Sequence, residues 1–304
     1  MALRSIASKF LLDGEQSPLG PPKGGHPKAI QQLLEGYRRE DPPSQPKLAV
    51  PLTVPRHIAQ QGARSTSPRT KAVGDLALIA FYYLLRVGEY TYHRPSDRRR
   101  TQHFRVHDVA FWHNTTLLPH DLPVEVLSAK CTSATLSISN QKNGRRNQSI
   151  HQERVACTHC PILALIRRVK HIQSHTSDPS TCIGTYFSSR AHKGRIVGPT
   201  DINTAVKQAV TDLGLARNGL LASHVGSHSL RAGGAMAMHL NHISHDTIKK
   251  MGRWSSDTFL MYIHEQIAVF SKNVSTKMSR PLEFHNIQFQ RIPAPTVYSH
   301  APVA

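Results

Sequence analysis

The sequence predicts an α+β fold that is mainly α-helical and contains a small antiparallel β-sheet. Three observations lead to this fold class. Residues 71–86 are strongly apolar over a helical length, residues 104–150 combine alternating and β-rich stretches, and helical patterns return from residue 161 onward.

The first predicted helix is Lys71–Arg86 (KAVGDLALIAFYYLLR), which should end near Val87-Gly88 because glycine suits a helix C-terminus. A second helix is expected over 161–175, with Pro161 at a favoured position in the first turn. Further helices are predicted over Asp201–Leu213, Ser229–Leu240, Asp246–Lys250 and from Asp257 onward.

The predicted strands lie between these helices. FRVHDVAFW (104–112) alternates in polarity, and LPVEVLSAK (122–130) and ATLSISNQ (134–141) are β-rich. Asn143-Gly144 is a typical hairpin turn. A short strand is also expected in TCIGTYF (181–187).

Composition divides the chain into three parts. Residues 1–70 are rich in Pro, Gly, Ser and basic residues, which predicts a basic, partly extended N-terminal arm with one helix at Ala29–Arg39. Residues 71–280 form the main predicted domain. Residues 281–304 contain four prolines and are predicted to be a flexible tail.

The charge balance indicates a polyanionic partner. Lys and Arg number 38 against 19 acidic residues, a net charge of +19, and nucleic acid is the partner that this excess favours. A membrane is disfavoured because the longest apolar run, Leu76–Leu85, is far shorter than the roughly 20 residues of a membrane span. The N-terminus does not read as a signal peptide, and the four cysteines are too few for a disulfide scaffold.

Four short motifs contain side chains suited to phosphate chemistry. In chain order they are Arg86 in LLRVGEY, Lys142 in QKNGRR, His228 and Arg231 in SHSLRAGG, and Trp254 in GRWSSD followed by Tyr262. The guanidinium group of arginine never loses its proton, and its planar fork matches two phosphate oxygens. Two arginines can therefore hold a phosphodiester from different sides and stabilise the charge that develops during attack.

The remaining motif residues suit the other parts of a transesterification. His228 and Arg231 are three residues apart and should share a face at the start of a helix. The Tyr262 phenol can act as nucleophile if nearby cations favour its phenolate form and His228 accepts its proton. Lys142 suits the general acid for the departing sugar oxygen, and Trp254 can either donate its indole N–H or pack beneath the site.

The ordered set of these motifs resembles the active-site pattern of the tyrosine recombinase (phage integrase) family. The segments FYYLLRVGEYT, QKNGRR, SHSLRAGGAMAM and GRWSSDTFLMYI are most similar to recombinases of eukaryotic Crypton- and DIRS-like mobile elements. The resemblance covers roughly residues 70–270. Trp254 precedes Tyr262 by eight residues, where many bacterial members have nine.

The resemblance implies the DNA breaking-rejoining fold, with the catalytic domain in residues 71–280 and a shortened core-binding region before it. By motif, Arg86 resembles the first arginine, Lys142 the β-hairpin lysine, His228 and Arg231 the HxxR pair, Trp254 the His/Trp position and Tyr262 the nucleophile. It further implies a 3′-phosphotyrosine intermediate, no metal or cofactor, double-stranded DNA as partner, a homotetramer on DNA and a nuclear location.

Basic side chains outside the motifs are predicted to contact the DNA backbone. These residues are Arg98, Arg99, Arg100, Arg145 and Arg146.

Three alternatives remain open. A metal-dependent nuclease or integrase needs clustered carboxylates, and the acids of this chain flank the motifs poorly. A catalytically inactive DNA-binding remnant of a mobile-element recombinase would keep the basic surface but not cleave. A type IB topoisomerase uses similar chemistry, although HSLRAGG and GRWSS fit recombinases better.

Overall fold

The computed structural model describes residues 31–32, 47–92, 103–138, 148–188, 191–254 and 260, without the side chains of 191–193. The chain divides into two compact units, residues 1–47 and 48–304. All elements described below belong to the second unit. Their helices and short antiparallel sheets confirm the predicted α+β, mainly helical class.

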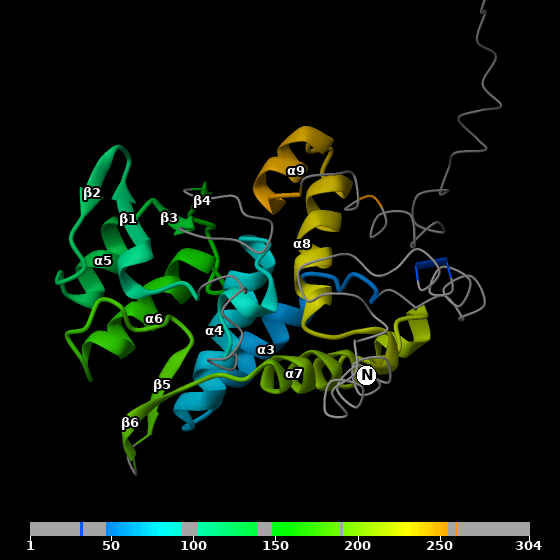
Figure 1. The fold of residues 1–304 in the computed structure, drawn as a ribbon, viewed down its shortest axis with the longest axis horizontal. Helices are drawn as coiled ribbons and strands as arrows, with labels where there is room; N and C mark the ends of the chain where they lie inside the picture. Colours follow the sequence, from blue (N-terminus) through cyan, green and yellow to red (C-terminus); the bar gives the residue numbers. More distant parts are fainter. Residues whose placement is uncertain are drawn as a thin grey trace, which may run out of the picture. The chain divides into compact units, whose positions relative to one another are not determined.

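Helix α4 (Pro68–Tyr82) lies at the centre of this unit (Figure 1). Ten consecutive residues, Ala72–Phe81, are buried, because other helices cover the helix on several sides. It begins where the Ser67 side chain accepts a hydrogen bond from the Thr70 N–H. The helices that pack most extensively against α4 are α3 (Thr53–Arg64), α6 (Pro161–Gln173) and α8 (His228–Leu240).

Two further helices complete the helical part. Helix α7 (Pro199–Asp212) packs against α3, and α9 (His245–Gly252) packs against α8. The predicted helices over 161–175, 201–213, 229–240 and 246–250 are therefore confirmed with small shifts at their ends. The helix predicted from Asp257 onward lies outside the described residues except at Leu260, which is helical.

The main sheet has four antiparallel strands in the order β2-β1-β3-β4. Its strands are β1 (Val109–His113), β2 (Thr116–Leu118), β3 (Ser133–Ile138) and β4 (Gln148–Glu153). In the antiparallel pair of β3 and β4, Ser133 lies opposite Glu153 at one end and Ile138 lies opposite Gln148 at the other. This confirms the pairing expected of the predicted hairpin. Its Asn143-Gly144 turn lies outside the described residues. A second sheet joins β5 (Thr185–Ser188) to β6 (Ala191–Ile196).

Two sequence-based predictions of local structure are wrong. The segment 122–130 was expected to be a strand because of its valines, but Val124–Lys130 is helix α5. Glu125 in its first turn and Lys130 in its last turn complement the helix dipole, and its Leu127 is buried. An extended arm was expected up to residue 70, but residues 53–64 form α3, because Val54 and Ile58, four residues apart, place a buried apolar stripe against the core.

The C-terminal end of α4 also differs from the prediction. The helix ends at Tyr82, and Arg86 lies in an extended conformation before the short 3-10 helix Val87–Glu89. The positive φ expected of a glycine is adopted by Leu84 instead, at 50°. This early ending turns the Leu84 carbonyl out of the helix, and the site below is built around that carbonyl.

Helices α4 and α8 approach closely at the two glycines that follow Arg231. A Cβ atom on Gly234 would lie 2.2 Å from the Phe81 carbonyl oxygen, and one on Gly233 would lie 2.2 Å from that of Val50. Larger residues at these positions would push α8 away from α4, and α8 carries two of the predicted site residues.

We therefore expect Gly234→Ala to lower the free energy of unfolding by about 1–3 kcal/mol, because the added methyl group overlaps rigid backbone. Urea denaturation measures this change. Gly88→Ala is the matched control, since no atom lies within 4 Å of a Cβ at that position. Equal stability of the two variants would contradict the close approach of α4 and α8.

No helix in the described part of the chain is both long and apolar enough to cross a membrane.

Candidate active site

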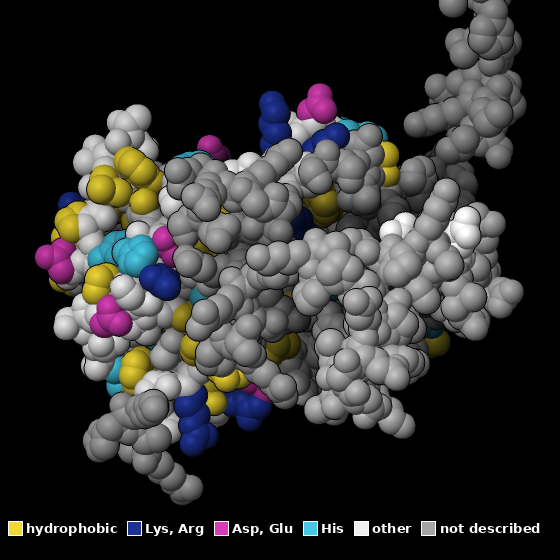
Figure 2. All heavy atoms as spheres, in the orientation of Figure 1, with side chains coloured by type: hydrophobic (Ala, Val, Ile, Leu, Met, Phe, Trp, Pro, Cys, Tyr) yellow, Lys and Arg dark blue, Asp and Glu magenta, His cyan; other side chains and the backbone are white. Residues whose placement is uncertain are grey.

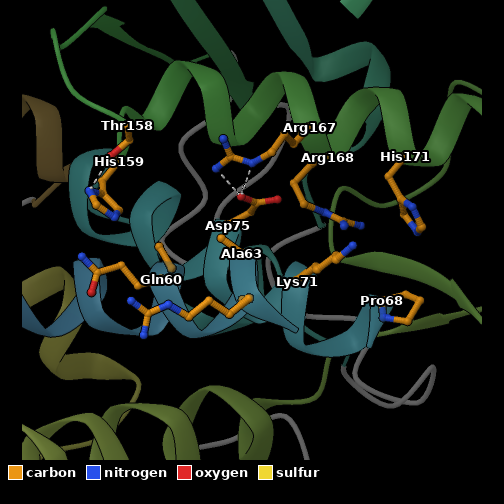
Figure 3. Close-up of a pocket in the computed structure, with 13 residues that line it drawn as sticks. Gln60, Ala63, Pro68, Lys71, Asp75, Thr158, His159, Arg167, Arg168 and His171 are labelled. Carbon is orange, nitrogen blue, oxygen red and sulfur yellow. Dashed lines mark hydrogen bonds and ion pairs between the residues drawn. The ribbon is translucent and has the colours of Figure 1, made fainter. Parts of the chain in front are cut away.

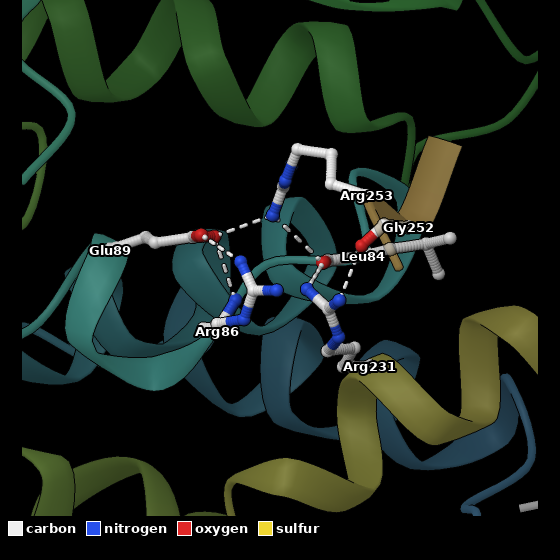
Figure 4. Close-up of polar contacts among 6 residues, drawn as sticks. All are labelled: Leu84, Arg86, Glu89, Arg231, Gly252 and Arg253. Atoms are coloured by element: carbon white, nitrogen blue, oxygen red, sulfur yellow. Dashed lines mark hydrogen bonds and ion pairs between the residues drawn. The ribbon is translucent and has the colours of Figure 1, made fainter. Parts of the chain in front are cut away.

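The backbone carbonyl of Leu84 is the meeting point of two arginines from distant parts of the chain (Figure 4). Arg231 donates to it from Nη1 at 2.6 Å, and Arg253 donates from Nη2 at 3.3 Å. Arg231 comes from the first turn of α8, and Arg253 directly follows α9. The end of α4 thus brings two guanidinium groups together.

Glu89 connects Arg253 to Arg86. Its side chain is 0% exposed and accepts from the Arg86 backbone N–H at 2.8 Å, from Arg86 Nη1 at 3.2 Å and from Arg253 Nη2 at 2.7 Å. A buried carboxylate is stable only when it is paired and hydrogen-bonded. Glu89 therefore orients two of the three arginines that gather here.

Arg231 is almost completely enclosed. It is 1% exposed, and besides Leu84 its Nη2 donates to the carbonyl of Gly252. The ring of Trp254 lies against its guanidinium, with 4.3 Å from Cζ to the ring centroid. Trp254 is held by its own contact with Gly252 and by an apolar cluster that includes Leu84. The structure thus places Trp254 beneath Arg231, in the packing arrangement that the sequence had left open.

Arg253 is a site residue that the sequence analysis did not select. It adopts a left-handed conformation (φ 56°) at the end of α9, which turns its side chain inward, where it is 1% exposed. Its Nε and Nη1 are buried and have no hydrogen-bond partner among the residues that the structure describes. Burial lowers the pKa of this guanidinium, and the charge of Glu89 opposes that effect.

His228 begins α8, one turn before Arg231. Loss of surrounding water and then the positive charges of Arg231 and Arg86 lower the pKa of its imidazole, although one side of the residue remains exposed. The ring is therefore mostly uncharged near neutral pH. An uncharged imidazole can accept a proton, which is the role that the sequence predicts for His228.

Four of the predicted catalytic residues are thus described: Arg86, His228, Arg231 and Trp254. The electrostatic effects on His228 and the shared partners of the arginines place them in one region, around the C-terminal end of α4. The other predicted site residues lie outside the described part of the chain. They are Lys142, Tyr262, Arg98, Arg99, Arg100, Arg145 and Arg146.

The arrangement suits the binding of an anion. Two guanidinium groups, those of Arg86 and Arg253, contact the Glu89 carboxylate, and the third, that of Arg231, shares the Leu84 carbonyl with Arg253, so the formal charge of the four side chains is 3 − 1 = +2. Burial of a donor without an acceptor is unfavourable, and among the described residues Nε and Nη1 of Arg253 have none, so an anionic oxygen within reach of them would remove that cost. In the described part of the chain, no group of three or more His, Cys, Asp and Glu side chains could hold a metal ion.

One signal in the sequence could have identified Arg253. It precedes Tyr262 by nine residues, the spacing usual in many bacterial members of the family that the chain resembles, whereas Trp254 precedes it by eight. The structure turns Arg253 toward Glu89 and Leu84.

Several solved recombinase and integrase structures resemble this chain. The XerH site-specific recombinase, in a post-cleavage complex with palindromic difH substrate, aligns with a TM-score of 0.48 and 13% identity over 76% of this chain and 54% of XerH. The pre-cleavage complex of XerH with difH aligns with a TM-score of 0.46 and 13% identity over 75% of this chain and 53% of XerH. The Tn1549 transposon integrase in complex with circular intermediate DNA aligns with a TM-score of 0.42 and 11% identity over 89% of this chain and 77% of the integrase chain. This chain spans about half the length of the XerH chains that it matches.

No family model matches the sequence, and no curated protein matches it either.

Proposed function

We propose that this protein is a site-specific DNA recombinase or integrase that cuts and rejoins DNA through a 3′-phosphotyrosine intermediate. The observation that carries the proposal is the convergence of Arg86, Arg231 and Arg253 at the end of α4, where two buried donors of Arg253 have no acceptor in the described part of the chain. A DNA phosphodiester supplies such an acceptor and matches the positive charge. The ordered motifs of the sequence support the same reaction.

The reaction balances without an external energy source. The Tyr262 oxygen attacks the phosphorus, a bond forms between them, and the bond from phosphorus to the 5′ oxygen breaks. His228 accepts the phenol proton, and Lys142 donates a proton to the departing 5′ oxygen. A 5′-hydroxyl of a second duplex then attacks the phosphotyrosine and reverses these steps. The arginines stabilise the charge on the non-bridging oxygens in both directions.

Several finer features belong to the same proposal. The catalytic domain covers residues 71–280, and the protein acts as a homotetramer on double-stranded DNA in the nucleus, as part of a mobile element. The DNA backbone is contacted by Arg98–Arg100, Arg145 and Arg146, for which the net charge of +19 is the support. Lys and Arg side chains also show over α9 in Figure 2, and Lys249 and Lys250 lie in its last turn, just before Arg253.

A second candidate function is a DNA-binding remnant that does not cleave. One observation favours it: Arg231 is 1% exposed and donates from both terminal nitrogens to backbone carbonyls, which is a structural use of that side chain. In such a protein the arginine group would stabilise the fold, while the basic surface would still hold DNA.

A nicked duplex distinguishes the two functions. The nick lies close to the target phosphate, so that the short fragment diffuses away after cleavage and the covalent complex is trapped. Because the reaction needs no metal, we expect a DNA band that survives SDS, disappears after protease treatment and forms equally in excess EDTA. Binding without any such band would favour the remnant, and a requirement for Mg²⁺ would rule out the tyrosine mechanism.

A further inference from the structure

A cavity of about 570 Å³ lies between helices α3, α4 and α6 (Figure 3). Gln60 and Arg64 of α3, Lys71 and Asp75 of α4, and Arg167, Arg168 and His171 of α6 are among its lining residues. Its volume falls within the range of pockets that bind small organic molecules. The proposed function makes no use of it.

The cavity is separate from the arginine group at the end of α4. Its lining residues Pro68, Lys71 and Asp75 belong to the N-terminal half of that helix, whereas Leu84, Arg86 and Glu89 follow its C-terminal end. Along the helix, the seven residues from Asp75 to the last helical residue, Tyr82, correspond to about 10 Å at 1.5 Å per residue. A ligand in the cavity would therefore not touch the candidate active site.

The charges around the cavity are strongly unbalanced. Asp75 Oδ1 accepts from Arg167 Nε at 2.8 Å and from Arg167 Nη2 at 2.5 Å, so these two charges compensate each other at the centre. Arg168 is 2% exposed and donates to the backbone carbonyls of Ile183 and Thr185. Among the described residues, no carboxylate forms an ion pair with it.

Two more cations at the cavity have exposed side chains. Within the described part of the chain, the side chains of Arg64 and Lys71 make no hydrogen bond or ion pair. Their helices are close together, since a Cβ on Gly62 would lie 3.1 Å from the Thr70 carbonyl oxygen and 3.5 Å from Lys71 Cα. Four cations against the single Asp75 give a formal charge of 4 − 1 = +3.

The two histidines at the cavity do not share this charge. Burial, followed by the charges of Arg168, His175 and Lys71, lowers the pKa of His171 to about 4. Burial and then Arg56 and Arg167 lower the pKa of His159 as well. Burial is the larger cause for both rings, and the neighbouring cations add to it, so neither histidine is expected to add a positive charge to the cavity near neutral pH.

We propose that this cavity binds a phosphorylated small molecule, with its phosphate at Arg64 and Lys71 and its organic body in the cavity. A phosphate monoester carries a charge near −2 at neutral pH, which compensates most of the excess positive charge. Lys71 and Arg64 supply donors that are not used elsewhere in the described structure. Ala59, Ala63 and Pro68 provide an apolar wall for the body of the ligand.

Calorimetric titration of the full chain with adenosine monophosphate and, separately, with inorganic phosphate tests this inference. We expect saturable binding of one adenosine monophosphate per chain, and weaker binding of inorganic phosphate, because only the former can contact the apolar wall. Arg64→Met and Lys71→Met should each raise Kd by about tenfold or more, since each removes a charge-assisted hydrogen bond. Lys207→Met, an exposed lysine on α7, is the matched control and should leave Kd unchanged.

Three results would overturn the inference. The first is the absence of saturable binding of adenosine monophosphate to a folded protein, one whose unfolding temperature is normal. The second is the same weakening in Lys207→Met as in Lys71→Met, which would indicate a general effect of net charge. The third is displacement of adenosine monophosphate by duplex DNA, because the cavity would then belong to the DNA surface. None of these measurements involves DNA cleavage, so the result does not depend on the proposed recombinase activity.

Discussion

Replacing Tyr262 with phenylalanine should abolish the covalent protein–DNA adduct and leave DNA affinity unchanged. Phenylalanine keeps the ring and removes only the oxygen that is proposed to attack the phosphorus. The basic side chains that hold the DNA backbone are untouched, so the binding energy should be preserved. The adduct is measured on the nicked duplex as the SDS-resistant band, and affinity is measured at one fixed salt concentration, because phosphate contacts depend strongly on salt.

Tyr92→Phe is the matched control for this experiment. Tyr92 is 47% exposed and lies in the segment that follows the Arg86–Glu89 turn, so the same atom is removed from a tyrosine near the site without a proposed role. This variant should form the adduct at the normal rate. Adduct formation by Tyr262→Phe would assign the nucleophile to another residue.

The helices of the fold were predictable because their apolar residues recur at helical spacing or fill a whole segment. Helix α4 is the clearest example, since its ten consecutive buried residues are all apolar or small except Asp75. The β3–β4 hairpin was equally accessible through alternation and an Asn-Gly turn signal. Local sequence determines such elements to a large extent, so a single chain suffices to predict them.

Features that depend on tertiary contacts could not be predicted in this way. The seven-residue helix α5 has valines that favour strands, and its helical state is fixed by the burial of Leu127. The left-handed conformation of Leu84 is not one that its side chain favours, and the arginines that bind its carbonyl come from α8 and from the residue after α9. The sequence motifs selected Arg86 and Arg231 and missed Arg253, and they gave no indication of the Leu84 carbonyl at which Arg231 and Arg253 meet.

The buried pair of Glu89 and Arg253 leads to the second large effect. Glu89→Ala should lower the free energy of unfolding by about 3–5 kcal/mol, because it leaves the charge of Arg253 buried without its partner. Both side chains are at most 1% exposed, and their contact measures 2.7 Å from Arg253 Nη2 to Glu89 Oε2. The loss of the Arg86 contact should contribute less to this change, since the Arg86 side chain is 25% exposed and water can replace part of its contact with Glu89. Urea denaturation followed by circular dichroism measures the change.

A double substitution tests the physical reason for that loss. Glu89→Met combined with Arg253→Met removes both charges and fills similar volume, so it should recover much of the stability that Glu89→Ala loses. The left-handed backbone at residue 253 is no obstacle, because arginine and methionine carry the same restriction there. Glu153→Ala, an exposed glutamate at the end of β4, should change stability by less than about 0.5 kcal/mol. If the double variant were as unstable as Glu89→Ala, the cost would come from lost packing around Glu89, and the unpaired charge of Arg253 would not be its cause.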